Sequence, residues 1–595
     1  MRAGKLSRLA DAVRAHVTPG MHLHFASTPS RSNAAVREIA RSFIGTRPRF
    51  KLSSTGFHSL LHLLPMLQLG ETLAGCFFGD HYPAPRPNPL YTRVAAAGVR
   101  LEQWSLGSFV ASLRAGAQGD RWAVNRTLAG TTLAAELAAA GAYRELPDPG
   151  DDTRALGLCA AMRPDVTFVH AAVGDDDGNV LMSAPFSEGL WSALGAKRGV
   201  IVTVERLAPC AWSREYPDLI ALPADRVLAV CVEPFGAHPQ SFHCEPDLGV
   251  ASYRDDFAHY DSWRALTTDE AAAGRVIARI VDGDDGGEAY RALVGGARLA
   301  ELCVPRARRG YRRTWTPVPP TLTSQETAIS QAAPLAIVKA KPQPKPNASS
   351  AIDRLIVGGA RQLQARAKAI GARVLIAGIG HAFFASRMAQ LQLADEGFEL
   401  QVMVEIGLYG VACGPEGHGY PLAYDNVRHA RRLTSIDDVL GVLSCGADNR
   451  CLGALGAAQV DGDGNLNSTR LADGRMLVGS GGACDIAAAA AEVVVLTRLE
   501  PGRLVTRLDY RTSPGRAVKS VVTDRGTLVR GDGGWQLVSL SSASGAADDR
   551  AAIERDCAWP LTFAADLTHA APVTTREAEL LTTLDPDGLF RGRAA

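Results

Sequence analysis

The sequence has almost no net charge, because its 63 lysine and arginine residues are balanced by 62 aspartate and glutamate residues. Without an excess of positive charge the chain has no field that would hold a polyanion through counterion release. It also lacks any apolar run near the roughly 18 residues that cross a membrane. Met1 to Pro19 show a charged amphipathic pattern where a secretion signal would have an apolar core. The sequence therefore predicts no nucleic acid partner, no membrane partner and a cytoplasmic location.

Paired cysteines are missing as well. Eleven cysteines are scattered along the chain without a C-x-x-C pair, and an odd total argues for reduced thiols over a disulfide framework. His58 and His62 are four residues apart, and His238 lies close to His243, but neither group has the full pattern of a known metal site. We therefore predict no bound metal and assign these histidines to loops or the core.

The composition is that of an ordinary soluble globular protein, with 46% hydrophobic and 21% charged residues. The 595 residues allow three to four domains at roughly 150 residues each. Residues 313–350 are rich in Pro, Ala, Ser and Thr and show no helical or strand periodicity, which is typical of an extended linker. This break predicts a first domain over residues 1–312, a linker over 313–350 and a second domain over 351–595.

The two flanks of this linker share a pattern. In the first, a helical apolar stripe over residues 6–17 is followed by Gly20 and a short apolar strand over 21–25. In the second, a stripe over 352–370 ends at Gly371 before a strand over 374–377. The order helix, glycine, strand occurs twice, which indicates an internal duplication.

A second repeated feature is a D-x-D-G-N turn that precedes a buried strand. Asn179 ends this turn in the first half and Asn465 ends it in the second, and their side chains could fix a sharp loop that shapes a site. Short apolar runs alternate with Ala-rich helical segments, which favours parallel sheets covered by helices. We predict two open α/β domains in tandem with mainly parallel sheets. The wider spacing of the markers in the first half places extra elements within residues 50–150.

Two groups of residues could carry chemistry in the second half. Glu405 follows a predicted strand over 401–404 and precedes Gly407, a strand-end position where α/β folds display functional groups. Gly479, Gly481 and Gly482 precede Ala483 and an Ala-rich helix, so their backbone amides could converge on an oxyanion or a phosphate. Taken singly, the glutamate could be a solvated edge residue and the glycine run a flexible turn.

In their order along the chain, these motifs resemble the family I CoA-transferases, in particular the glutaconate-type and 3-oxoacid-type enzymes. The matching stretches are VEIGLYG around Glu405, LGAAQVDGDGNLNS over 455–468 and GSGGACD over 479–485, with LRAGAQG over 113–119 in the first half. The resemblance implies that one chain fuses the alpha-type and beta-type subunits. It places the catalytic glutamate at Glu405 and the oxyanion and CoA contacts at Gly479, Gly481, Gly482 and Ala483, with Gly481 as the first donor.

The reaction that this resemblance implies moves CoA between an acyl-CoA and a small or medium carboxylic acid. It passes through an acyl-glutamyl anhydride and then a glutamyl-CoA thioester. With a reference pKa of about 4.3, the glutamate is expected to be ionised at neutral pH without an activating base. CoA would be a substrate, and no tightly bound cofactor is expected. Further association into a homo-oligomer is compatible with one complete site per chain.

One residue departs from the family pattern. Leu106 stands where 3-oxoacid-type members have a glutamine that assists the oxyanion, which makes a 3-oxoacid substrate less expected. Three alternatives stay open: an acyl-CoA or ring-opening hydrolase on the same scaffold, a non-catalytic CoA-binding protein, and a nicotinamide dehydrogenase. The last rests only on Gly378-Ile379-Gly380, and Phe383 occupies its third glycine position. The Pro-rich stretch 81–89 could be a loop near the substrate.

Overall fold

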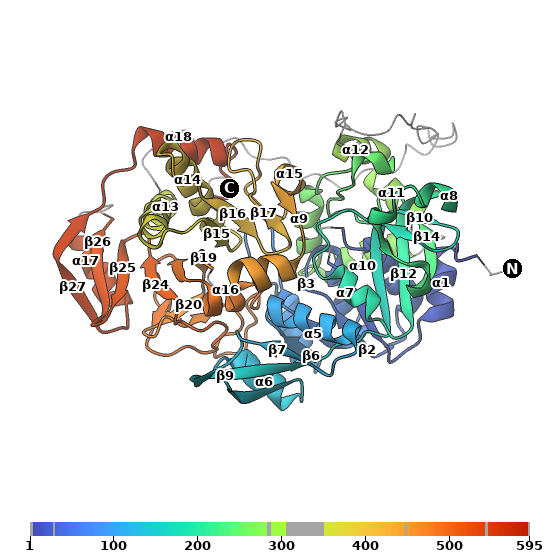
Figure 1. Cartoon of the computed structure of the whole chain (residues 1–595), viewed down its shortest axis with the longest axis horizontal. Coiled ribbons are helices and arrows are strands. Elements are labelled where there is room, and N and C mark those ends of the chain that lie inside the picture. Colours follow the sequence, from blue (N-terminus) through green and yellow to red (C-terminus); the bar gives the residue numbers. More distant parts are fainter. Residues whose placement is uncertain are drawn as a thin grey trace.

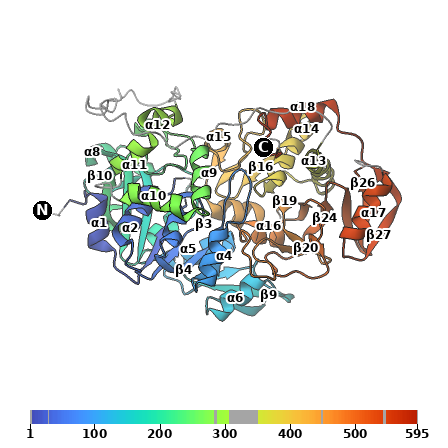
Figure 2. The ribbon, with the colours of Figure 1, turned by 180° about the vertical axis from the view of Figure 1, so that it is seen from behind.

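The computed structural model describes residues 4–27, 30–281, 287–304, 350–446, 449–541 and 546–592. On either side of the gap before Ser350 the chain forms a large sheet covered by helices, and the two halves lie side by side (Figures 1 and 2). The prediction of two α/β domains in tandem is therefore confirmed. Apart from Ser350, the predicted linker over 313–350 lies outside the described residues, so its exact limits stay predictions.

The first half is built on a nine-stranded sheet whose central strands are parallel. In spatial order the parallel strands are β6 (Arg100–Gln103), β4 (Gly70–Gly75), β2 (Phe50–Ser53), β1 (His22–Phe25), β10 (Val166–Asp175), β12 (Gly199–Ala208) and β14 (Val227–Val232). The short strands β11 (Val180–Leu181) and β13 (Ile220–Leu222) extend the sheet, with β11 antiparallel to both β10 and β13. Helices α1 (Leu9–His16), α2 (Asn33–Phe43), α5 (Leu106–Gln118) and α7 (Gly189–Leu194) pack around it.

The second half is built on a ten-stranded sheet with a parallel centre. This centre consists of β16 (Gln401–Val404), β15 (Val374–Ala377), β19 (Cys451–Gly456), β22 (Glu492–Leu496) and β24 (Val518–Val522). The strands β17 (Leu408–Tyr409) and β18 (Arg432–Leu433) extend one edge, and β25 (Gly526–Gly531), β26 (Gly534–Leu540) and β27 (Leu561–His569) extend the other.

The alternation of side chains along the strands of the second sheet shows which helices cover each of its faces. Successive side chains of a strand point to opposite faces of its sheet. Leu375 and Val494 belong to the apolar cluster that holds α13 (Ala351–Ile370) and α14 (His381–Asp395). Their neighbours Ile376 and Val493 belong to a second cluster, with residues of α16 (Ala483–Ala489) and of the first half. The face that carries α16 is therefore turned toward the first half, as Figure 1 shows.

The remaining elements complete the two halves. As predicted, the first half has an insertion, a three-stranded sheet of β7 (Trp122–Asn125), β8 (Tyr143–Asp148) and β9 (Asp151–Ala160) with α6 (Thr132–Ala139). The other elements are β3 (Gly56–Phe57), η1 (Ser59–His62), α3 (Leu63–Met66), β5 (Phe77–Phe78), α4 (Pro89–Ala96), α8 (Cys210–Ser213), η2 (Pro217–Leu219), η3 (Ala224–Arg226), η4 (Pro246–Leu248), α9 (Phe257–Leu266), α10 (Glu270–Val281), α11 (Gly287–Val294), α12 (Gly296–Leu302), α15 (Tyr424–His429), η6 (Asp437–Ser444), β20 (Gln459–Asp461), β21 (Leu466–Asn467), β23 (Leu504–Val505), α17 (Ala546–Asp556) and α18 (Thr575–Leu584).

Both D-x-D-G-N turns are tight hairpins held by their aspartates. Asp175 accepts hydrogen bonds from the backbone and side-chain nitrogens of Asn179, at 2.8 and 2.9 Å, between β10 and β11. Asp461 accepts the equivalent bonds from Asn465, at 2.9 and 3.0 Å, between β20 and β21. The same local geometry in both halves agrees with an internal duplication. The asparagines act here as donors to the aspartates.

Two negative findings apply to the described residues. None of their helices combines the length and the apolar character that a membrane-crossing helix requires. All eleven cysteines are free thiols, as the sequence predicts.

Candidate active site

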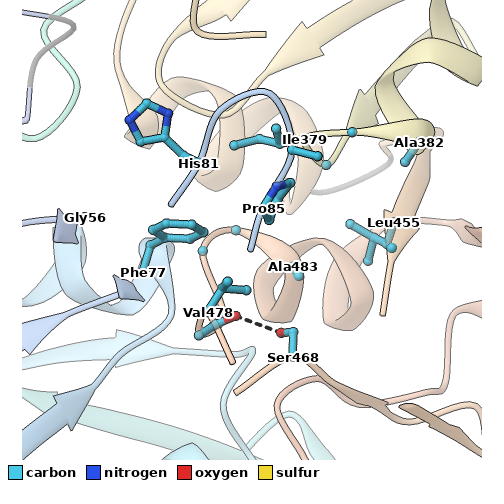
Figure 3. A pocket seen from close by; sticks show the side chains of 18 of the residues that line it. Gly56, Phe77, His81, Pro85, Ile379, Ala382, Leu455, Ser468, Val478 and Ala483 are labelled. Carbon is cyan, nitrogen blue, oxygen red and sulfur yellow. Dashed lines mark hydrogen bonds between the residues drawn. The ribbon is translucent and has the colours of Figure 1, made fainter. Parts of the chain in front are cut away.

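A cavity of about 570 Å³ lies where the two halves meet. In Figure 3, Phe77 and His81 of the first half lie across the cavity from Ile379, Leu455 and Ala483 of the second half. Both sheets therefore contribute walls to a single cavity. The predicted loop over residues 81–89 contributes His81, Ala84, Pro85 and Pro87 to the lining.

Glu405 enters this cavity from a sharp turn. It directly follows β16, and β17 pairs back onto β16, so Glu405, Ile406 and Gly407 form the connection. Gly407 has φ of +116°, and a Cβ atom there would lie 2.5 Å from the backbone oxygen of Thr434. A residue with a side chain would therefore strain or open the turn. Gly407 does not line the cavity, but it permits the turn that presents Glu405.

The Glu405 carboxyl is held away from water. Its Oε2 atom is buried and has no hydrogen-bond partner among the described residues. Burial raises the pKa of Glu405 to about 7, because the charged form loses its hydration. The expectation of a fully ionised carboxylate with an ordinary pKa is therefore corrected: near neutral pH the acid and the carboxylate coexist.

Gly482 is the glycine that faces Glu405. A Cβ atom at Gly482 would lie 3.6 Å from both Cβ and Cγ of Glu405, so the two residues are immediate neighbours. Gly482 is the N-cap of α16, where helix N–H groups lack partners within the helix. Among the described residues its N–H group has no backbone acceptor. It is available to an oxygen atom bound beside Glu405.

The other backbone N–H groups of the predicted oxyanion segment already donate hydrogen bonds within the protein. The N–H groups of Gly479, Gly481 and Ala483 donate to the backbone oxygens of Ser468, Cys76 and Ser480, each at 2.9 Å. The bond from Gly481 to Cys76 reaches across to the first half, and Gly481 in turn accepts from the N–H of Leu106 at 2.9 Å. This occupancy counts against Gly481 as the first oxyanion donor and favours Gly482.

Leu106 lines the cavity, whereas the asparagines of the two repeated turns lie outside it. Leu106, which begins α5, lines the cavity with an apolar side chain where a glutamine would have offered a donor. Asn179 and Asn465 do not line the cavity. Asn465 accepts a hydrogen bond from the N–H of Gly515 at 2.9 Å and so fixes loops of the second half.

One part of the cavity wall is polar and contains an uncharged histidine. His81 lines the cavity, and its Nδ1 atom lies 2.6 Å from the hydroxyl of Tyr420, which belongs to the second half. Burial lowers the pKa of His81 to about 3, so the ring is neutral. Asp255 also lines the cavity, and burial raises its pKa to about 6 while Tyr260 donates to it at 2.7 Å.

A second part of the lining contains the basic groups that the sequence alone did not locate. Arg498 and Arg503 line the cavity with Glu500 and contact its carboxylate at 3.1 and 3.0 Å. The Gly378-Ile379-Gly380 turn and the first residues of α14 also belong to the lining. Helix N–H groups and arginines both favour anions.

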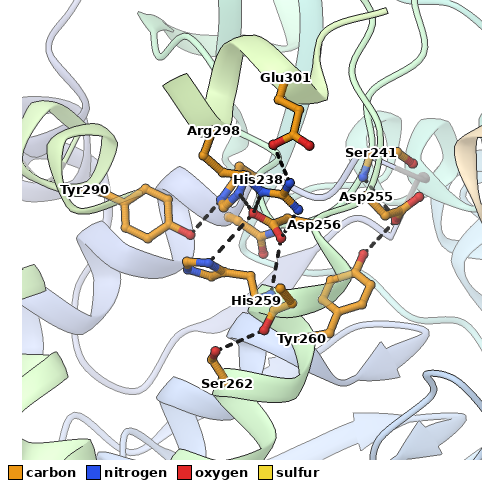
Figure 4. A network of polar contacts seen from close by, with 12 residues as sticks. His238, Ser241, Asp255, Asp256, His259, Tyr260, Ser262, Tyr290, Arg298 and Glu301 are labelled. Atoms are coloured by element: carbon orange, nitrogen blue, oxygen red, sulfur yellow. Dashed lines mark hydrogen bonds and ion pairs between the residues drawn. The ribbon is translucent and has the colours of Figure 1, made fainter. Parts of the chain in front are cut away.

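His238 is grouped with Asp256 and His259, and His243 is not part of this group. Figure 4 shows His238 beside Asp256 and His259, and one potential ligand atom from each lies within 4.8 Å of the others. The Asp256 carboxylate contacts His238 at 3.2 Å and accepts two bonds from Arg298, at 3.2 and 2.9 Å. A guanidinium directly on the carboxylate opposes cation binding. We interpret this group as a structural hydrogen-bond network.

The first half matches the family model of the coenzyme A transferases over residues 6–230. This match identifies residues 6–230 as a coenzyme A transferase domain. Two curated relatives are the two different subunits of the 3-oxoadipate CoA-transferase of Pseudomonas knackmussii. One is 31% identical over 29% of this chain and 56% of its own length. The other is 29% identical over 22% of this chain and 58% of its own length. The matches span little more than half of each relative.

The fold of the whole chain also has a solved counterpart. An acyl-CoA transferase of Escherichia coli O157:H7 aligns with 96% of this chain and 95% of its own, with a TM-score of 0.63 and 15% identity. The same protein has been solved as a thioester complex with CoA. At this identity the likeness establishes the fold.

Proposed function

We propose that this protein transfers CoA between an acyl-CoA and a free carboxylic acid, with Glu405 as the nucleophile. The observation that carries the proposal is the buried, unpartnered Oε2 of Glu405 beside Gly482, in a cavity between the two halves of the described chain. This oxygen atom has lost its water and has no hydrogen-bond partner among the described residues. That is the state in which it can attack a bound carbonyl carbon.

The proposed reaction has two halves. The Glu405 carboxylate attacks the thioester carbonyl, and the resulting oxyanion accepts a hydrogen bond from the Gly482 N–H. The C–S bond breaks, which leaves an acyl-glutamyl anhydride and the CoA thiolate. The thiolate then attacks the glutamyl carbonyl and releases the first acid, so that CoA is held as a glutamyl thioester. A second carboxylate collects CoA by the reverse steps.

CoA binds, in this proposal, with its phosphates toward Arg498 and Arg503. The two arginines and the amino end of α14 supply positive charge and helix N–H groups to the lining. Contacts far from the reacting carbon can hold the thioester in line with Glu405. No tightly bound cofactor takes part in this scheme.

The proposal is tested by the requirement for an acceptor acid. The enzyme is incubated with an acyl-CoA and a panel of isotopically labelled small carboxylic acids, and new acyl-CoA is detected by mass spectrometry. Transfer predicts labelled acyl-CoA that forms only when the acid is present. Release of free CoA at the same rate without any acid would support the hydrolase alternative and contradict the proposal.

The rate of transfer is expected to fall in acid. Because burial raises the pKa of Glu405 to about 7, protonation removes the nucleophile below that pH. The value of kcat/KM should therefore fall about tenfold per pH unit below the pKa and level off above it. Exchange assays between pH 5 and 9 measure this profile. A rate that stays constant down to pH 5 would contradict the assignment of Glu405.

Replacing Arg498 by alanine is expected to weaken CoA binding. Loss of one charge-assisted contact to phosphate should raise KM for acyl-CoA by roughly 5- to 30-fold, while KM for the free acid changes little. The matched control is Arg475→Ala, because Arg475 pairs with Asp473 at the surface and does not line the cavity. Equal effects of both variants, or an effect on the acid alone, would contradict this placement of CoA.

A further inference from the structure

The β5–α4 loop, residues 79–88, reaches from the first half to the second half beside the cavity. The loop residues that line the cavity are His81, Ala84, Pro85 and Pro87. A Cβ atom on Gly380, at the amino end of α14, would lie 3.7 Å from both Ala84 and Pro85. Figure 3 shows Pro85 beside Ile379. The loop therefore contacts the second half while it forms part of the cavity wall.

The base of this loop is fixed within the first half. The N–H of Asp80 donates to the backbone oxygen of Arg86 at 3.0 Å, and the N–H of Arg86 donates back to Asp80 at 2.8 Å. The Asp80 carboxylate accepts from Asn88 at 3.1 Å and contacts Arg264 at 3.2 Å. The tip of the loop, residues 81–85, forms no helix or strand. Its position therefore depends on side-chain contacts.

Tyr82 makes most of these contacts. Its ring, which is only 8% exposed, stacks on Phe257 of α9 with centroids 4.1 Å apart and an angle of 13°. It also meets two rings of the second half edge to face, Tyr420 at 5.6 Å and Phe590 at 6.1 Å. Phe590 in turn packs on Phe384 of α14 at 5.2 Å. Tyr82 itself does not line the cavity, so it can affect the cavity only through the loop.

The intermediates of the proposed reaction are open to attack by water. Water adds its oxygen to the acyl carbon of the anhydride, the bond from that carbon to the Glu405 oxygen breaks, and Glu405 leaves as a carboxylate. One proton of the water goes to the CoA thiolate, and the other leaves with the acid. The sum is hydrolysis of the acyl-CoA without an acceptor acid. A wall that keeps its place during turnover excludes this water.

We propose that Tyr82 is a positioning residue, which fixes the β5–α4 loop against the second half and so sets the ratio of CoA transfer to hydrolysis. This inference rests on the proposed function and deepens it, because it names the contact that protects the covalent intermediates. The bond between His81 and the hydroxyl of Tyr420 attaches the same tip to the second half. Without the Tyr82 ring, the contact of Pro85 with Gly380 loses its main support.

The test measures two rates on the full chain, the transfer of CoA to a labelled acid and the release of CoA without any acid. Because Tyr82→Ala removes several aromatic contacts, the ratio of hydrolysis to transfer should rise by about tenfold or more. Tyr82→Phe keeps the ring and should keep this ratio within about twofold of wild type. A loss of folded protein lowers both rates equally and cancels in the ratio.

A second variant tests the same contact from the other half. Phe590→Ala leaves the loop sequence intact, should raise the ratio by about threefold, and serves if Tyr82→Ala does not fold. The matched control is Phe43→Ala, because Phe43 meets Phe50 edge to face at 4.9 Å and does not line the cavity. Its ratio should equal that of wild type.

The outcomes separate this inference from the proposed function. A ratio that stays at the wild-type value in Tyr82→Ala and Phe590→Ala, or that rises as much in Phe43→Ala, would overturn the role of Tyr82. Absence of transfer to every acid in the wild type would instead overturn the proposed function itself.

Discussion

Replacing Glu405 by glutamine is expected to lower the rate of CoA exchange by at least about 10³-fold, with little change in the folded structure. Glutamine has nearly the same shape, but its amide cannot form the anhydride or the thioester. The residual rate should show no step near pH 7, because the group that titrates there is gone. Exchange between an acyl-CoA and a labelled acid measures the rate.

The matched control for this variant is Glu416→Gln. Glu416 is exposed and does not line the cavity, so its replacement should leave the exchange rate within about twofold of wild type. Binding of acyl-CoA to Glu405→Gln should persist, since the proposed CoA contacts are elsewhere in the cavity. Exchange at the wild-type rate in Glu405→Gln would remove this residue from the mechanism.

Replacing Asp485 by alanine is expected to destabilise the contact between the halves by about 3 kcal/mol. Asp485 lies in the first turn of α16, and its buried carboxylate accepts bonds from Ser105, the N–H of Gly107 and Thr127, at 2.9, 2.8 and 2.7 Å. All three donors belong to the first half, and each would lose its acceptor. Because Gly482 caps the same helix, the exchange rate should fall as well.

Urea unfolding followed by tryptophan fluorescence measures this change in stability. Asp473→Ala provides the control, because Asp473 is exposed and bonded mainly to its neighbour Arg475. Its effect should stay within about 0.5 kcal/mol. An Asp485→Ala protein as stable as the control would show that this contact does not hold the halves together.

Much of the fold could be predicted because it depends on local patterns. The stripe over 352–370 and the glycine after it correspond to α13 and its C-cap Gly371, which has φ of +63°. The strand over 401–404 coincides with β16, because four buried apolar or uncharged residues in a row leave no helical face. The repeated turns also form as expected, although the aspartates and not the asparagines accept the bonds.

The site could be predicted only in part, because its decisive properties depend on contacts between distant residues. The sequence places Glu405 at a strand end, but its raised pKa comes from burial in a cavity that both halves enclose. The sequence cannot show that the N–H of Gly481 donates a hydrogen bond to Cys76, some 400 positions earlier. Because of this bond, Gly482 is the available donor.

The most direct test of the central proposal is mass spectrometry of the enzyme after brief exposure to an acyl-CoA without acceptor acid, followed by borohydride reduction. The mechanism predicts a CoA adduct on the intact protein and, after reduction of the thioester, a peptide in which the side chain of Glu405 has become an alcohol. An unmodified Glu405 under conditions of full turnover, or an adduct on any other residue, would contradict it.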